Sequence, residues 1–345
     1  MLRAHSILLR ALLTLVLPIL GCATAAAEPP RVVVSLLPLH SLAASVMGDL
    51  GEPRLLVQGA ASPHSFALRP SDAAALQDAD LVIWVGEGLE SFLAKPLENL
   101  AGRARVLELA EAEGVALLPT RDGSGWAAHG HEHEHDDEHD HEDQHAHEDE
   151  HDHEEHGHGA TEDSGEAAHS HGAYDPHIWL DPANAEAIVE VIAMALAEID
   201  PANAATYRSN AAETVGALQA MDEGMAARLA PVAERPYLVF HDGYQYFEAH
   251  YGLSPLGAVA VSPERSPGAG HLAELRTQVQ SQDVACVFSE PQFEPQLLDA
   301  VIEGSAARKA VLDPLGATLE PGPKAYFLLM DRLAESLAAC LAPRG

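Results

Sequence analysis

RPYLVFHDGYQYFEAHYGLSPLGAVAV, residues 235–261, has the pattern of a strand, a helix and a second strand. It opens with a short apolar run rich in aromatic and β-branched residues, which is typical of a strand buried on both faces. A segment of helix length, GYQYFEAHYG (243–252), follows and ends on glycine, and a second apolar run, SPLGAVAV (254–261), comes after it. Strand, helix and strand in this order predict a parallel sheet covered by helices.

The same alternation extends outward from this stretch in both directions. Strands are expected at 31–38, 53–59, 80–86, 104–110, 235–242, 254–261, 283–291 and 309–314. Helices are expected at 39–51, 71–80, 89–102, 182–200, 203–229, 243–252, 271–282, 293–304 and 323–341. The sequence therefore predicts an α/β protein of two lobes, each with a mainly parallel sheet flanked by helices.

One helix is expected to connect the two lobes. The alanine-rich segment from about Asn203 to Leu229 has high helix propensity and would be on the order of 40 Å long. We therefore expect an N-terminal lobe at 28–202, a linking helix at 203–232 and a C-terminal lobe at 233–345, with a cleft between the lobes.

Residues 1–27 have the pattern of an export signal. A basic start precedes a short apolar run and the small residues of CATAAA, which predicts cleavage near Ala27. Arg10 and Pro18 interrupt the apolar run, so it is too short to span a membrane. A lipid attached to Cys22, in ILGC, is the alternative to a freely soluble product. The mature chain is thus expected in the periplasm, without direct insertion into a membrane.

The composition excludes some classes of partner. The formal net charge is −34, from 53 acidic and 19 basic residues, and only 5% of residues are aromatic. This is the wrong charge for nucleic acid or an anionic membrane surface. Half of the acidic excess lies in one segment, because residues 129–171 hold 17 Asp and Glu and no Lys or Arg.

That segment also holds 14 of the 21 histidines. They are His129, His131, His133, His135, His139, His141, His145, His147, His151, His153, His156, His158, His169 and His171. The region 121–173 has almost nothing to bury, so we expect it to be disordered without ligand and to capture metal weakly. Each site there would have to order its own backbone, whereas a preformed cleft would not. The alternative is an acidic spacer with incidental histidines.

Polar residues stand where strands end, which is where open α/β sheets bind ligands. His64 and His241 follow strands, as do Glu290 and Asp313, and His177 lies where the His-rich segment returns to folded sequence. Three imidazoles with a carboxylate or water suit Zn²⁺ better than Mn²⁺ or Mg²⁺. Taken singly, each histidine has a structural alternative as a hydrogen-bonded core residue.

Asp242 is expected to support the site without binding the metal itself. As the neighbour of His241 it is expected either to fix the tautomer of that imidazole or to cap the next helix.

Five motifs in order carry a resemblance that covers the chain from about Arg31 to Leu341. They are GASPHSFALRPSDAAALQDADLVIWVGEGLESFL, DPHIWLDP, VFHDGYQYFEAHYGL, VFSEPQF and LDPLG. They resemble the zinc-binding solute-binding proteins of ABC importers, of the ZnuA type. The resemblance implies two α/β lobes joined by a rigid helix, with one Zn²⁺ between them.

The resemblance also implies the ligands. The three zinc-binding histidines fall on His64, His177 and His241, and related manganese binders carry a carboxylate at the last of these positions. Some zinc members have an acidic residue just before the first histidine, where this chain has Pro63. We favour Asp313 as the fourth ligand, with Glu290 or a water as alternatives.

Two cysteines remain after the signal, Cys286 and Cys340. An even pair in an oxidising compartment favours a disulfide, with two buried thiols as the alternative. The family's disulfide falls on the same two residues.

Three classes of function compete. A delivery protein would bind one Zn²⁺ without turnover and would act as a monomer with a membrane permease and its ATPase. A zinc hydrolase would need an open coordination position, a general base such as Glu290, and a substrate pocket. A storage protein would depend on the His-rich segment. The histidines at strand and loop ends, His64, His177 and His241, would then have no explained role. The sequence favours delivery, with no enzymatic activity.

Overall fold

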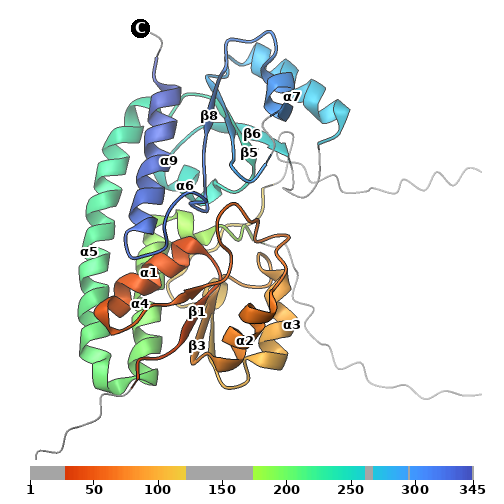
Figure 1. Cartoon of the computed structure of the whole chain (residues 1–345). Helices are drawn as coiled ribbons and strands as arrows, with labels where there is room; N and C mark the ends of the chain where they lie inside the picture. Colours follow the sequence, from red (N-terminus) through yellow and green to blue (C-terminus); the bar gives the residue numbers. More distant parts are fainter. Residues whose placement is uncertain (1–27, 122–173, 261–266, 294–295, 344–345) are drawn as a thin grey trace, which may run out of the picture.

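The structure is a computed structural model that describes residues 28–121, 174–260, 267–293 and 296–343 (Figure 1). Two predicted features lie outside these residues: the signal with Cys22, and the 14 histidines from His129 to His171.

The N-terminal lobe is built on a parallel sheet of four strands in the order β2-β1-β3-β4. The strands are β1 (Val32–Val34), β2 (Arg54–Leu55), β3 (Leu81–Trp84) and β4 (Arg105–Glu108). Every residue of the two central strands, β1 and β3, is buried. This accounts for their uninterrupted apolar sequences, because a central parallel strand is covered on both faces.

The C-terminal lobe repeats this arrangement, with strand order β6-β5-β7-β8. Its strands are β5 (Tyr237–His241), β6 (Pro255–Ala260), β7 (Cys286–Ser289) and β8 (Arg308–Val311). All eight expected strand positions are therefore occupied by strands, and the prediction of two lobes with parallel sheets is confirmed.

Nine α-helices lie within the part of the chain that the structure describes. They are α1 (Leu37–Met47), α2 (Pro70–Asp78), α3 (Ser91–Leu100), α4 (Pro182–Ile199), α5 (Ala204–Leu229), α6 (Gln245–Tyr251), α7 (Ala269–Ser281), α8 (Gln296–Ile302) and α9 (Ala325–Leu341). A short 3-10 turn, η3 (Ile178–Leu180), precedes α4.

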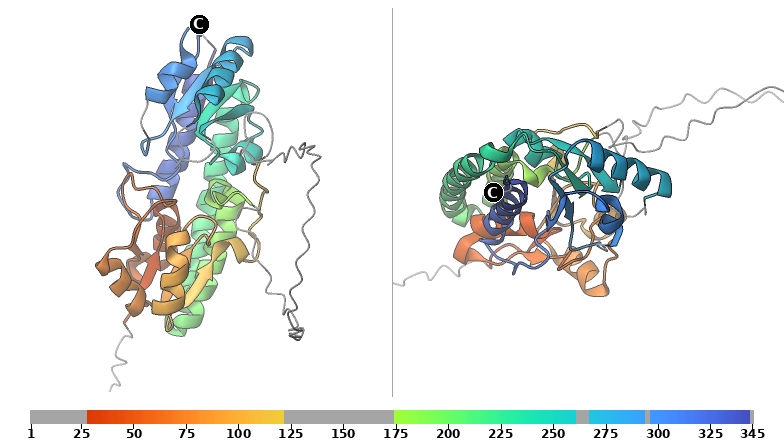
Figure 2. Two further views of the ribbon diagram at one scale, coloured as in Figure 1. Left: turned by 90° about the vertical axis from the view of Figure 1, so that its right-hand side faces the viewer. Right: turned by 90° about the horizontal axis from the view of Figure 1, so that it is seen from above.

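The two lobes are stacked one above the other (Figure 2), and the long helix α5 runs beside both of them (Figure 1). Its 26 residues span about 39 Å at 1.5 Å per residue, close to the predicted length. Only one stripe of it is buried, made of Tyr207, Ala211, Thr214, Leu218, Met225 and Leu229. Through this stripe α5 packs against α1, α4 and α9 (Figure 1).

The hydrophobic core is continuous between the lobes, which the sequence did not indicate. One buried cluster contains β1 residues such as Val34 together with Val239 of β5 and Leu337 of α9. Helix α9 belongs to the C-terminal lobe in sequence, yet it packs against α1 of the other lobe. A shared core of this kind resists large rotation of one lobe against the other, because rotation would expose apolar surface.

The predicted disulfide is present. Cys286, the first residue of β7, is bonded to Cys340 near the end of α9, with the two Cα atoms 6.1 Å apart. It anchors the last helix to a central strand of the second sheet.

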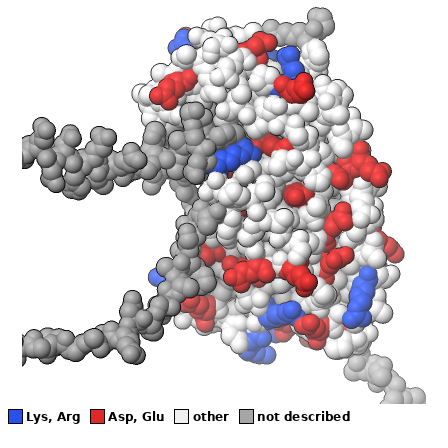
Figure 3. All heavy atoms as spheres, turned by 180° about the vertical axis from the view of Figure 1, so that it is seen from behind, with Lys and Arg blue, Asp and Glu red and all other residues white. Residues whose placement is uncertain are grey.

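The surface carries the acidic excess. On the face seen from behind, acidic side chains are spread widely and basic ones are few (Figure 3). Among the described residues, no helix is both long enough and apolar enough to cross a membrane.

Candidate metal centre

Three histidines that are far apart in sequence converge between the lobes. His64 lies on the loop after β2, His177 immediately precedes η3, and His241 is the last residue of β5. One ring nitrogen from each lies within 4.8 Å of those of the other two. This is the one group of three possible metal-ligating side chains found in the described ranges.

The His177 and His241 rings are already spaced as zinc requires. Their Nε2 atoms are 3.2 Å apart. Two nitrogens bound to one tetrahedral Zn²⁺ at about 2.0–2.1 Å would lie about 3.3 Å from each other. These two imidazoles therefore fit a shared zinc ion with almost no movement.

A carboxylate orients each of these two rings. Asp175 Oδ1 lies 2.7 Å from His177 Nδ1, and Glu290 Oε1 lies 2.6 Å from His241 Nδ1. All four residues are buried. Because each Nδ1 faces an acceptor, it carries the proton, and the lone pair of each Nε2 is left to point at the metal.

His64 is held differently. Among the described residues it makes ring contacts with His177 and His241, at centroid distances of 5.7 and 6.2 Å, and no hydrogen bond to its imidazole is present. Burial lowers its pKa to about 3, and the neighbouring His177 and His241 add to this shift. His64 is thus a neutral imidazole at physiological pH, as a zinc ligand must be.

The pKa of His241 is moved in the opposite direction. Burial lowers it, but the Glu290 carboxylate, with Asp175 and Asp242, outweighs burial and raises it overall. A proton therefore competes with metal for His241 more strongly than for His64.

The prediction that Asp242 orients the imidazole of His241 was wrong. Asp242 forms an ion pair with Arg121, with 3.4 Å between Oδ1 and Nη1, and Glu290 is the residue that binds the imidazole. Burial raises the pKa of Asp242 to about 7, although Arg121 opposes the shift. Asp242 does not cap α6 either, since the N-cap residue there is Tyr244.

Asp313, the favoured fourth ligand, is not in the histidine group. Its carboxylate accepts hydrogen bonds from the backbone N–H groups of Leu315, Gly316 and Ala317, at 3.2, 3.0 and 2.7 Å, and from Gln292 Nε2 at 3.2 Å. It shapes the turn after β8.

Two residues that shape the site, Asp175 and Gly243, were not predicted from the sequence. Asp175, only two residues before His177, could have been found from its proximity. Gly243 follows His241 by two residues, and a Cβ built there would lie 2.4 Å from His241 Nε2 and 3.1 Å from His177 Nε2. A side chain at this position would collide with the imidazoles of His241 and His177, so their close packing requires glycine.

The space at the histidines is very small. Its volume is about 10 Å³, and Ser62, Pro63, Gln292, Phe293, Pro314 and Leu315 complete its walls. A space of this size is about what is needed to hold one water molecule. The arrangement can enclose a single ion but offers no room for an organic substrate.

Comparison with known proteins agrees with this geometry. Residues 32–340 match the model of the ZnuA family, described as zinc-uptake complex component A, periplasmic. The chain is 45% identical over 317 residues to the high-affinity zinc uptake system protein ZnuA of Brucella suis biovar 1 (strain 1330), covering 92% of this chain and 93% of that protein. It is 41% identical over 343 residues to the protein of the same name from Paracoccus denitrificans (strain Pd 1222), covering 99% of each.

The fold is also that of a solved structure. A crystal structure of ZnuA superposes with a TM-score of 0.70 at 22% identity, covering 91% of this chain and 100% of that one. The family match spans nearly the whole described chain, and both relatives exceed 40% identity over more than nine tenths of their length. The chain belongs to the ZnuA family of periplasmic zinc-uptake components.

Proposed function

We propose that this chain captures Zn²⁺ in the periplasm and delivers it, as a monomer, to the permease and ATPase of an ABC importer. The observation that carries the proposal is the pair of Nε2 atoms 3.2 Å apart, each aimed by a buried carboxylate into a space of about 10 Å³. Relatives named as high-affinity zinc uptake proteins support the choice of ion and pathway.

His64, His177 and His241 are the proposed ligands, and they come from both lobes. Three neutral imidazoles leave the bound Zn²⁺ with its full charge, which the nearby carboxylates Asp175 and Glu290 compensate without touching the ion. We propose water as the fourth ligand. Using Asp313 would break the hydrogen bonds that form its turn.

The hydrolase alternative is disfavoured by two features of the site. A general base must reach a metal-bound water, but the Glu290 carboxylate is engaged with His241 Nδ1 at 2.6 Å. A substrate must also fit beside the metal, and a space of about 10 Å³ admits none.

The remaining proposals concern segments outside the described residues. We propose that residues 1–27 direct export and are removed near Ala27. The alternative is that a lipid attached to Cys22 tethers the mature chain. We propose that the histidines of 129–171 act as an auxiliary zinc-capturing or sensing segment, and storage through that segment is the second candidate function.

A zinc titration of the purified mature protein tests the proposal, by calorimetry with a competing chelator. It compares the full chain, a version lacking 129–171, and that version with His64→Ala. His271→Ala in α7 is the control, because its imidazole contacts the Ala258 carbonyl away from the cluster. We expect one tight site after the deletion, lost with His64→Ala and kept with His271→Ala. Loss of tight binding on deletion alone would refute the cleft as the functional site.

A further inference from the structure

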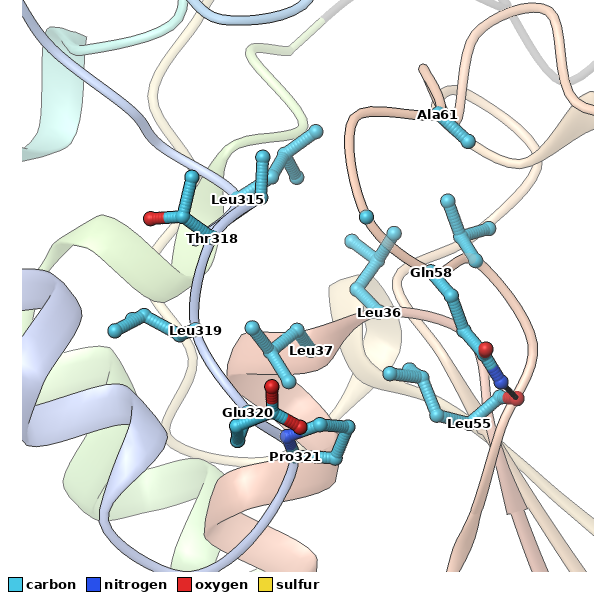
Figure 4. A pocket seen from close by; sticks show the side chains of 13 residues that line it. Leu36, Leu37, Leu55, Gln58, Ala61, Leu315, Thr318, Leu319, Glu320 and Pro321 are labelled. Carbon is cyan, nitrogen blue, oxygen red and sulfur yellow. Dashed lines mark hydrogen bonds between the residues drawn. The ribbon is translucent and has the colours of Figure 1, made fainter.

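The small space at the histidines shares one wall with a much larger cavity. A cavity of about 300 Å³ lies between the lobes, lined from one side by residues such as Leu36, Leu55 and Ala61 and from the other by the turn 315–321 (Figure 4). Leu315 is the one residue that lines both this cavity and the space at the histidines.

The large cavity opens to solvent at its rim. Gln58, Gly59, Thr318 and Glu320, all exposed, contribute to its lining. Glu320 is its one acidic lining residue, and its negative charge favours the approach of a cation.

Three other parts of the surroundings of the histidines are closely packed, at Gly243, Phe293 and Pro314. The backbone at Gly243 approaches the imidazoles so closely that a Cβ would clash. Phe293 is stacked on Phe240 with ring centroids 4.6 Å apart, and Pro314 is tied to the first lobe because its carbonyl accepts the Trp179 indole N–H at 2.9 Å. Leu315 is by contrast a half-buried aliphatic side chain that can change rotamer.

We propose that zinc enters and leaves the histidine cluster through the inter-lobe cavity, past the side chain of Leu315, which gates the exchange. The proposal of a gate rests on the proposed function, because it assumes that zinc binds to the three histidines. A leucine cannot coordinate zinc, so it would affect how quickly the ion passes and not how tightly it is held. The role of Asp313 is then indirect, since its carboxylate builds the turn that places Leu315 over the histidines.

The turn carrying Leu315 is well placed to respond to the lobes. Gly316, at φ +71°, packs so closely on the first lobe that a Cβ there would lie 2.9 Å from Leu37 Cδ2. A small change in lobe spacing would therefore move Leu315.

Stopped-flow transfer of zinc to and from a zinc-sensitive dye tests the gate, with the full mature chain and three variants. Leu315→Ala is expected to raise the association and dissociation rates together, by about tenfold each, and to leave the Kd within about twofold. Leu315→Phe is expected to slow both rates. Leu319→Ala, which lines the large cavity but not the histidine space, is the matched control and should leave both rates unchanged.

Melting temperatures of the variants show that each is folded. Unchanged rates in both Leu315 variants would overturn the gate while leaving zinc capture intact. A faster dissociation with an equally weakened affinity would also overturn it, because it would mean that Leu315 supports the ligand geometry. Failure of the unaltered chain to bind zinc tightly would instead refute the proposed function.

Discussion

Replacing Gly243 with alanine should abolish tight zinc binding. The new Cβ would lie 2.4 Å from His241 Nε2, whereas real Cβ contacts stay above 3.0 Å, so the imidazole would have to retreat by at least about 0.6 Å. Zinc–ligand distances tolerate deviations of only about 0.2 Å. Displacing a ligand should cost at least as much as removing the partner that orients it, about 100-fold in affinity or 2.7 kcal/mol.

Competition between the protein and a chelator of known zinc affinity measures this loss. Gly224→Ala is the matched control, because nothing lies within 4 Å of the added Cβ and the residue is inside α5. That change should leave zinc affinity unaltered and raise helix stability by about 0.5–1 kcal/mol. Affinity of Gly243→Ala equal to that of the unaltered chain, with a normal melting temperature, would refute the placement of zinc between the two Nε2 atoms.

Three further outcomes are expected. Glu290→Gln should weaken zinc binding by about 10–100-fold in the same competition assay, because a neutral amide orients and polarises the imidazole less well; an unchanged affinity would contradict its positioning role. The hydrogen bond that His250 donates to Asp181 raises the pKa of this imidazole above its ordinary 6.5, and Asp222 contributes as well. This stabilisation is complete below pH 6.5 and is lost as the pH rises through the raised pKa. His250→Gln should accordingly lower the melting temperature at pH 6 but much less at pH 9, and an equal loss at both would show that the charge is irrelevant. Replacing both Cys286 and Cys340 with alanine should reduce the free energy of unfolding by about 2–4 kcal/mol in urea titrations, and a smaller loss would mean that α9 docks without the bond.

Much of the fold could be predicted because each strand carries its own signal. Runs such as RVVVSLLP and DLVIWVG are apolar throughout, and such runs are typical of central parallel strands. The long helix was predicted closely, since alanine-rich sequence without proline or glycine pairs extends from one lobe to the next. These signals are local, so they can be recognised in a single sequence.

Features that depend on contacts between distant segments could not be predicted. Helix α9 has a broad apolar face, but nothing in its sequence says that part of this face covers α1 of the other lobe. The assignment of Asp242 to His241 failed for the same reason. Proximity in sequence favoured it, but half-buried Arg121, which precedes the His-rich segment in sequence, attracts that carboxylate instead.

The candidate site shows which ligand features a sequence can carry. His64 and His241 were selected because strand ends of an α/β sheet face the binding cleft, and the structure brings both into one cluster with His177. Asp313 also follows a strand, so the same rule selected it, yet its carboxylate serves its own turn. Position at a strand end identifies candidates, and only the hydrogen bonds distinguish a ligand from a turn-forming residue.

The three imidazoles differ in how firmly their surroundings hold them. His177 and His241 already have tetrahedral spacing across the lobe boundary, and Trp179, between them and α9, donates to the Pro314 carbonyl and accepts from Tyr326 through its own carbonyl. Together with the continuous core, these contacts hold the lobes at a spacing that suits the ion. The third imidazole, His64, is on a loop and has a carboxylate partner nowhere among the described residues. Among the three imidazoles, His64 is therefore the one least restrained by contacts with its surroundings.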